Sequence, residues 1–124
     1  MSQNQLIKSR KKAYESQNGF CIYCELPMWS DNVEAFAKKF KITKKQALIF
    51  QCTAEHLKSK KDGGKDGEQN IVAACKYCNH KRHARKKPKD PLAYKTLVTK
   101  RVLKGAWTAS MMNKSTYTRI RTSH

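Results

Sequence analysis

Residues 54–79 read AEHLKSKKDGGKDGEQNIVAACKYCN, and this stretch decides the fold. Its short apolar runs, residues 54–57 and 71–74, are strand candidates. The polar residues 59–69 contain several glycines and must form a loop or wide turn. Residues 76–87 have the composition of a helix that ends before the following proline. The pattern therefore predicts a β-hairpin that leads directly into a helix.

Outward from this stretch, the sequence predicts further helices at residues 5–17, 32–40, 44–51 and 92–104. Asp31 and Thr43 stand where N-caps of the second and third of these helices are expected, each followed three residues later by Glu or Gln. This pair resembles a helix-turn-helix in outline. It is expected either to close on itself as a packed hairpin or to read DNA.

The composition points to a polyanionic partner. Lys and Arg number 27 and Asp and Glu number 9, which gives a formal charge of +18. Such an excess repels itself unless phosphates neutralise it, so nucleic acid is the expected partner. Structural proteins of ribonucleoprotein particles and chromatin are equally basic, so charge alone says nothing of catalysis. No apolar run spans a membrane or resembles a signal peptide, and a cytoplasmic location is expected.

Four of the five cysteines form two pairs at metal-binding spacing, Cys21 with Cys24 and Cys75 with Cys78. In a reducing compartment such pairs favour a metal over a disulfide. Four thiolates close the tetrahedral shell of Zn²⁺, so the predicted zinc is structural and ties two distant segments together. The remaining Cys52 has no partner at motif spacing and is expected to be a small buried residue.

The order of residues around the hairpin resembles the HNH (ββα-metal) endonuclease family. The residues that carry the resemblance are Glu55 and His56, the Gly63–Gly64 turn, Asn70, and Asn79 directly after the last cysteine. The four flanking cysteines are similar to those of the phage endonuclease VII type. The resemblance implies a small zinc-knotted α+β domain with a ββα-metal core and flanking helices. One domain is expected over residues 1–124, with its core at about 20–88 and basic arms at 5–17 and 90–124.

The resemblance also assigns roles to single residues. Neutral His56 is the general base that takes a proton from water, a role that suits imidazole near pH 7. Glu55 and Asn79 hold one catalytic cation, Mg²⁺ or Mn²⁺, which prefers oxygen ligands. Asn70 holds the hairpin loop and orients the base. His83 lies four residues after Asn79 on the same helical face, and is either a third metal ligand or a phosphate contact.

Basic residues crowd the predicted catalytic helix and its exit, and they are expected to grip the phosphate backbone without reading sequence. They are Lys81, Arg82, Arg85, Lys86, Lys87 and Lys89. His80 is expected to be a surface or phosphate contact. Trp107 and Tyr117, in the acid-free C-terminal part, are expected either to stack on bases or to pack on the body.

The sequence therefore predicts a metal-dependent endonuclease that hydrolyses phosphodiester bonds in nucleic acid, with DNA favoured over RNA. By resemblance, its products carry 5′-phosphate and 3′-hydroxyl ends. The alternative is a zinc-containing nucleic-acid-binding or structural protein without catalysis, although binding alone does not need Glu55, His56 and Asn79.

Overall fold

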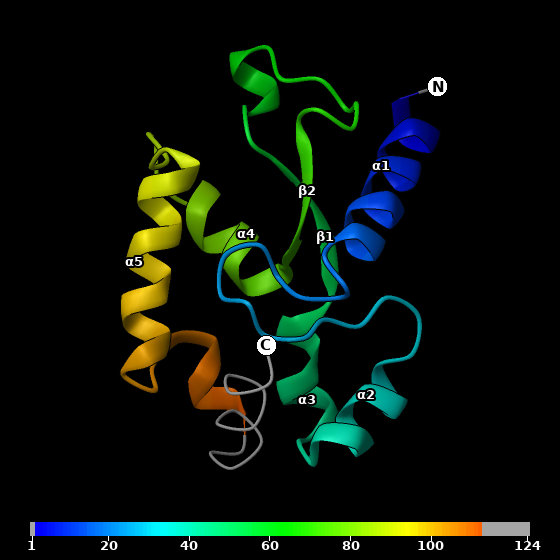
Figure 1. Cartoon of the computed structure of the whole chain (residues 1–124), viewed down its shortest axis with the longest axis vertical. Coiled ribbons are helices and arrows are strands. Elements are labelled where there is room, and N and C mark those ends of the chain that lie inside the picture. Colours follow the sequence, from blue (N-terminus) through cyan, green and yellow to red (C-terminus); the bar gives the residue numbers. More distant parts are fainter. Residues whose placement is uncertain (1, 113–124) are drawn as a thin grey trace.

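The computed structural model describes residues 2–112, drawn in colour in Figure 1. A two-stranded antiparallel hairpin stands at the centre, with helix α1 along one side and helices α4 and α5 on the other (Figure 1). In chain order the elements are α1 (Ser2–Ser16), α2 (Val33–Phe40), α3 (Lys44–Ala47), the 3₁₀ turn η1 (Leu48–Phe50), β1 (Cys52–His56), η2 (Lys60–Asp62), β2 (Ile71–Cys75), α4 (Lys76–His83), α5 (Pro91–Leu103) and η3 (Trp107–Met111). The predicted α+β class and the hairpin that leads into a helix are confirmed.

The hairpin brings both ends of the deciding stretch together. Cys52 pairs with Cys75 and His56 with Ile71, so the strands are in register over their whole length. The loop between them closes tightly at Gly64, where an added Cβ would lie 1.8 Å from the carbonyl oxygen of Lys58. Only glycine fits so close a backbone approach. The loop consequently returns β2 alongside β1.

Local signals set most of the helix ends. Thr43 and Gln46 form the predicted capping box of α3. The cap predicted at Asp31 is wrong by one residue, because Asn32 accepts the hydrogen bond from the N–H of Ala35 and begins α2. Helix α5 begins with Asp90 as its N-cap, ahead of proline at the first position.

Helix α4 ends at His83, four residues before the predicted end at residue 87. A contact between the helix and a later part of the chain accounts for this earlier end. The Arg82 Nε donates to the carbonyl oxygen of Lys89 at 3.0 Å, which requires the chain to turn back across the end of the helix. Pro88 also disfavours a helical conformation for the residue before it.

Buried side chains from α1 through to the end of η3 form one cluster among the described residues. Its largest fully buried members include Tyr23, Phe50, Val98 and Val102, which come from the cysteine-containing turn, η1 and α5. Cys52 is buried in the same cluster, as predicted, and burial raises the pKa of its thiol to about 11. Across residues 2–112, no helix is both long enough and apolar enough to cross a bilayer.

Candidate metal and catalytic site

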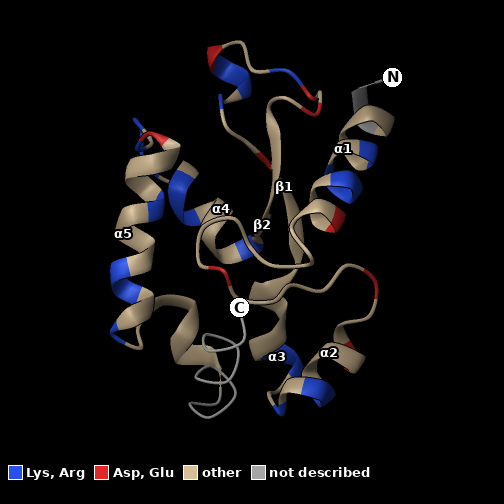
Figure 2. Ribbon diagram, viewed as in Figure 1, with Lys and Arg blue, Asp and Glu red and all other residues tan. Residues whose placement is uncertain are grey.

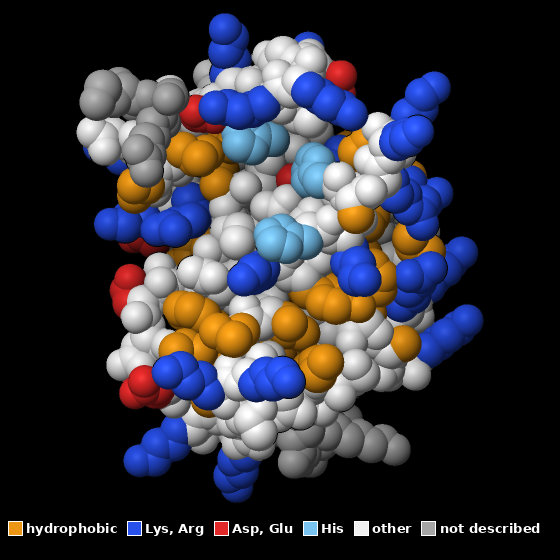
Figure 3. All heavy atoms as spheres, turned by 180° about the vertical axis from the view of Figure 1, so that it is seen from behind, with side chains coloured by type: hydrophobic (Ala, Val, Ile, Leu, Met, Phe, Trp, Pro, Cys, Tyr) orange, Lys and Arg blue, Asp and Glu red, His pale blue; other side chains and the backbone are white. Residues whose placement is uncertain are grey.

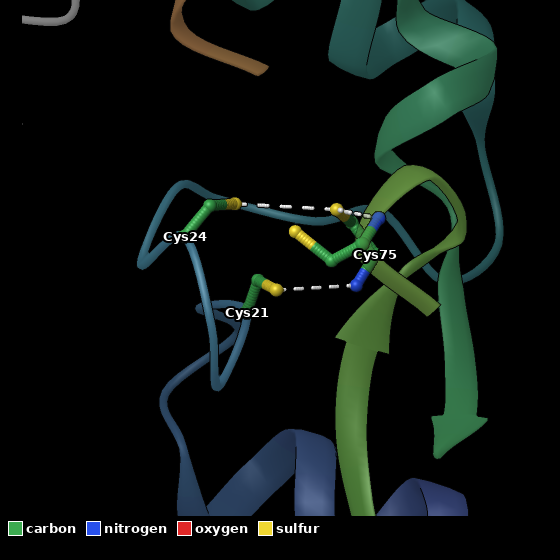
Figure 4. Close-up of side chains that lie close together, drawn as sticks. Cys21, Cys24 and Cys75 are labelled. Atoms are coloured by element: carbon green, nitrogen blue, oxygen red, sulfur yellow. Dashed lines mark hydrogen bonds between the residues drawn. The ribbon is translucent and has the colours of Figure 1, made fainter. Parts of the chain in front are cut away.

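The two cysteine pairs meet at the base of the hairpin. Cys21 and Cys24 lie in the turn after α1 and face Cys75 at the end of β2 (Figure 4). Cys78 follows in the first turn of α4. All four sulfurs lie within 4.8 Å of one another, and the Sγ atoms of Cys24 and Cys75 are 4.0 Å apart. A tetrahedron of Zn–S bonds of about 2.3 Å has edges of about 3.8 Å. The four buried cysteines are therefore positioned to bind a metal ion.

Hydrogen bonds to sulfur arrange this cluster. The backbone N–H groups of Tyr23 and Cys75 donate to Cys21 Sγ at 3.4 and 3.3 Å, and the N–H of Cys78 donates to Cys75 Sγ at 3.5 Å. Burial opposes ionisation of Cys21, but hydrogen bonds from the other three thiols and from the Cys75 N–H outweigh it and hold the pKa of Cys21 well below its ordinary value. Burial raises the pKa values of Cys75 and Cys78 well above theirs. A bound cation would relieve this conflict by stabilising all four thiolates.

Glu55 is the centre of the second cluster. It sits on β1 with a fully buried side chain. One carboxylate oxygen, Oε2, accepts hydrogen bonds from the Tyr23 hydroxyl at 2.7 Å and from Arg82 Nη1 at 3.0 Å. The other oxygen, Oε1, lies 2.7 Å from His83 Nε2. Burial, followed by the nearby Glu55 charge, raises the pKa of Tyr23, so this phenol stays a donor.

His56 follows Glu55 on the strand, and its side chain reaches a different partner. Its Nε2 lies 2.8 Å from the Oδ1 of Asp66, a residue of the loop between the strands. The hydrogen bond with His56 is the main cause that lowers the pKa of Asp66, with Lys60 adding to it. Asp66 was not among the predicted site residues. Its neighbours in the loop are also polar, so the sequence carries no signal that distinguishes it.

Asn70 holds the loop that carries Asp66. Its amide Nδ2 donates to the carbonyl oxygens of Lys58 and Lys65, both at 2.9 Å, and its Oδ1 accepts from the Lys58 N–H at 2.8 Å. Lys65 directly precedes Asp66, so Asn70 fixes the position from which Asp66 meets His56. The Ser9 hydroxyl of α1 adds a bond to the Asp66 carbonyl oxygen at 2.7 Å.

Helix α4 presents Asn79 and His83 toward β1. The Asn79 Nδ2 donates to Thr53 Oγ1 at 3.0 Å and to the Ala54 carbonyl oxygen at 3.1 Å. Because the Asn79 amide nitrogen donates both hydrogen bonds to β1, these bonds also fix the orientation of its carbonyl oxygen Oδ1. His83 joins the cluster through its contact with Glu55, whereas His80 is exposed beside Arg10.

Arg82 requires a correction to the predicted phosphate-gripping cluster. It is 5% exposed, and its guanidinium binds Glu55 and the carbonyl oxygens of His56, Leu57 and Lys89. A side chain held in this way offers no surface to a phosphate. The other predicted members, Lys81, Arg85, Lys86, Lys87 and Lys89, are exposed.

Positive charge is spread over the molecule and not confined to one helix. Lys and Arg colour parts of α1, α4 and α5 in Figure 2. On the face seen in Figure 3, histidine side chains gather in the middle and Lys and Arg side chains surround them. The described histidines are His56, His80 and His83.

The family comparison matches the part of the chain that carries these contacts. Residues 37–85 match the family model described as HNH endonuclease. The chain is similar to HNH endonucleases over this segment, which is 49 of its 124 residues. The matched HNH segment begins within α2 and ends just beyond α4, so it contains Glu55, His56, Asn70, Asn79 and the second cysteine pair. Members of the HNH family act on nucleic acid.

Searches of curated proteins and of solved structures returned no match. Cys21 and Cys24 precede the matched HNH segment, and the structure brings them to Cys75 and Cys78. The predicted likeness to the phage endonuclease VII type stays a prediction.

Proposed function

We propose that this protein is a metal-dependent endonuclease that hydrolyses phosphodiester bonds, with DNA as its main substrate. One observation carries the proposal. A carboxylate oxygen of Glu55 and a ring nitrogen of His83 lie 2.7 Å apart. The residue after Glu55 is His56, whose ring is held by Asp66. The groups that we propose as metal donors and as base thus lie together in the segment that matches the HNH model.

The residues around Glu55 fit a hard divalent cation. Neighbouring ligands of an octahedral Mg²⁺ at about 2.1 Å lie about 3 Å apart, close to the spacing between Glu55 Oε1 and His83 Nε2. Tyr23 and Arg82 hold the other oxygen, Oε2, which leaves Oε1 as the donor to the cation. Asn79 Oδ1 is the third proposed donor. A cation bound there, Mg²⁺ or Mn²⁺, would stabilise negative charge on the phosphate and on the leaving oxygen.

His56 supplies the base. In its neutral form it donates Nε2–H to Asp66 Oδ1, and the lone pair on Nδ1 then accepts a proton from water. We assign this tautomer from the chemistry of the partner, because an ionised carboxylate only accepts. Asp66 is therefore a positioning residue, supported in turn by Asn70 and by Ser9 of α1. The expected products carry a 5′-phosphate and a 3′-hydroxyl.

The cysteine cluster has a separate role in this proposal. Four thiolate ligands satisfy the tetrahedral preference of Zn²⁺ and leave no position for water or substrate. We infer that the ion is zinc and that it stabilises the fold without entering the reaction. It joins the turn after α1 to the first turn of α4, the helix that carries Asn79 and His83.

The exposed cations hold the substrate. Lys81 and the basic residues from Arg85 to Lys89 lie at the exit of α4, and Arg10, Lys76 and His80 line a hollow beside β1. Contacts of this kind bind the phosphate backbone on any sequence and weaken as salt is added.

Plasmid nicking by the His56→Ala variant tests the proposal. In Mg²⁺ or Mn²⁺ the wild-type protein should nick the plasmid, and the variant should be slower by about 10²–10⁴-fold, the usual contribution of a general base. Its metal content, melting temperature and DNA affinity should match the wild type. Wild-type protein that binds DNA but never nicks it would favour the alternative, a non-catalytic zinc-containing binding protein.

A further inference from the structure

A groove runs between α4 and α5, away from the Glu55–His83 cluster, and its lining is both aromatic and cationic. It encloses about 590 Å³, within the usual size of ligand pockets. The residues that give it its character are Tyr77, Trp107, Lys81, Arg85 and Arg101, and none of the lining residues is acidic. Aromatic faces beside cations are the features that bind single-stranded nucleic acid, since every base has a face that can stack.

Helix α4 separates this groove from the candidate catalytic site. At 100° per residue, Tyr77 and Lys81 lie on the side of α4 opposite Asn79 and His83, and Arg85, just beyond the end of the helix, also lines the groove. The hydrogen bond from the Tyr94 hydroxyl to the Cys78 carbonyl oxygen, 2.6 Å long, holds α5 against α4 beside the groove. The helix with its side chains is about 10 Å thick. A strand in the catalytic site can therefore reach the groove by passing around the exposed end of α4.

The aromatic residues are held rigidly. The rings of Tyr77 and Trp107 pack edge to face with centroids 5.0 Å apart, and the Trp107 Nε1–H donates to Cys78 Sγ at 3.3 Å. Trp107 also has a backbone φ of 62°, which is rare and strained for a bulky residue. Lys81 lies 5.4 Å from the centre of the Tyr77 ring, and Arg101 lies 5.1 Å from that of Trp107.

We propose that this groove binds an unpaired nucleotide of the substrate, with its base on the Tyr77–Trp107 pair and its phosphate at Lys81, Arg85 and Arg101. The inference rests on the proposed function, because it identifies the substrate as nucleic acid with a single-stranded segment next to the cleaved bond. The groove adds affinity for such a segment. The chemistry stays with Glu55 and His56.

Binding measured without divalent metal tests the groove. Fluorescein-labelled oligothymidylate should bind the His56→Ala protein roughly tenfold more tightly than an abasic strand of the same length and charge, because stacking requires a base. In the same background, Arg101→Ala should weaken the binding of both strands several-fold, because it removes a phosphate contact in the groove. Lys100→Ala is the matched control, since it deletes an exposed charge of the same helix outside the groove. It should weaken both strands equally and only slightly.

Equal affinity for the two strands would overturn the proposal, as would equal effects of Arg101→Ala and Lys100→Ala. Competition with polyglutamate of matched charge gives a further test. If polyglutamate displaces the labelled strand as well as unlabelled oligothymidylate does, the proposal is overturned in favour of an acidic polypeptide as the ligand. A second pair of variants changes Tyr77. Tyr77→Leu should lose the preference for the base-containing strand, and Tyr77→Phe should keep it. Both variants should keep one zinc per chain. These outcomes are independent of nicking. A protein that never cleaves can still prefer the base-containing strand, and a nuclease without this groove nicks but shows no preference.

Discussion

Arg82 shows that the environment of a residue can differ from that of its neighbours in the sequence. It stands in a run of basic residues, yet its guanidinium is buried against the Glu55 carboxylate and three backbone carbonyl oxygens. It therefore links β1, the segment after it and the chain beyond α4. A buried charge with this many partners is costly to break, because its removal leaves the opposite charge poorly compensated.

We expect Arg82→Met to lower the free energy of unfolding by about 3 kcal/mol, the lower end of the range for a broken buried ion pair. The methionine keeps the apolar stem and removes only the charged head. Urea unfolding followed by circular dichroism measures the change. Arg85→Ala is the matched control, since Arg85 is exposed, and it should stay within about 0.5 kcal/mol of the wild type. Equal stability of the two variants would contradict the role given to Arg82.

Asp66 governs the orientation of His56 in the proposed mechanism. We expect Asp66→Ala to lower kcat for cleavage by roughly 10²-fold, because a misplaced base loses its alignment with the attacked phosphate. KM for DNA should change little. Asp66→Asn should keep more activity, since its Oδ1 still accepts Nε2–H. Steady-state kinetics on a nicking substrate separate the two constants, and an alanine variant with the kcat of the wild type would exclude the positioning role.

At the scale of elements, the cysteine cluster joins the turn after α1 to the end of β2 and the start of α4. The turn with Cys21 and Cys24 meets the start of α4, where Cys75 is also the N-cap and its Sγ accepts from the N–H of Cys78. The Trp107 indole reaches the same sulfur cluster from η3. One metal ion bound by these cysteines would set the positions of a turn, a strand end and a helix start.

Cys78→Ser is expected to lose the bound metal and to unfold. Structural zinc contributes on the order of 10 kcal/mol to folding in small domains, comparable to the whole stability of a typical protein. Elemental analysis of the purified protein and its circular dichroism spectrum check both parts. Cys52→Ala serves as control, because Cys52 is equally buried but lies outside the cluster, and it should keep one zinc per chain. A Cys78→Ser protein with wild-type melting temperature would show that the cluster does not depend on metal.

At the scale of the whole molecule, a single buried cluster connects residues from α1 to the end of η3. It draws on segments outside the matched HNH part, including Ala13 of α1, Val98 and Val102 of α5, and Ala109 of η3. Since these segments share one core with the hairpin, we propose that they fold as one domain with it. The predicted role of Tyr117 lies outside the described residues.

Unfolding of the zinc-bound protein in urea should therefore be one cooperative transition. Tryptophan fluorescence, which reports on Trp29 and Trp107, and far-ultraviolet circular dichroism, which reports on all helices, should give the same midpoint. Trp29 bonds to the Ala47 carbonyl oxygen near the hairpin, and Trp107 lies in the C-terminal arm, so the fluorescence reports on both parts. Two separated midpoints would indicate that an arm forms an independent unit.

The sequence by itself determined the features that depend on local spacing and residue chemistry. The CxxC spacing, the capping box at Thr43, the proline near the start of α5 and the glycines of the hairpin loop each act within a few residues, so they can be identified without the fold. The HNH segment could be predicted for the same reason, since its residues follow in order along one short stretch. The end of α4 at His83, and not at residue 87, escaped this reasoning, because a side-chain contact across the turn decides it.

The tertiary structure alone decided which of many similar residues carry the site. In the sequence, Asp66 is one polar loop residue among several. In the structure, its Oδ1 lies 2.8 Å from the Nε2 of His56 on β1. Ser9 supports that loop from a helix 57 positions earlier, and Arg82 is buried while its basic neighbours are exposed. The physical reason is common to all of these residues. Burial and hydrogen-bond partners depend on which segments pack together, and pairings between distant residues leave no periodic or spaced pattern in the chain.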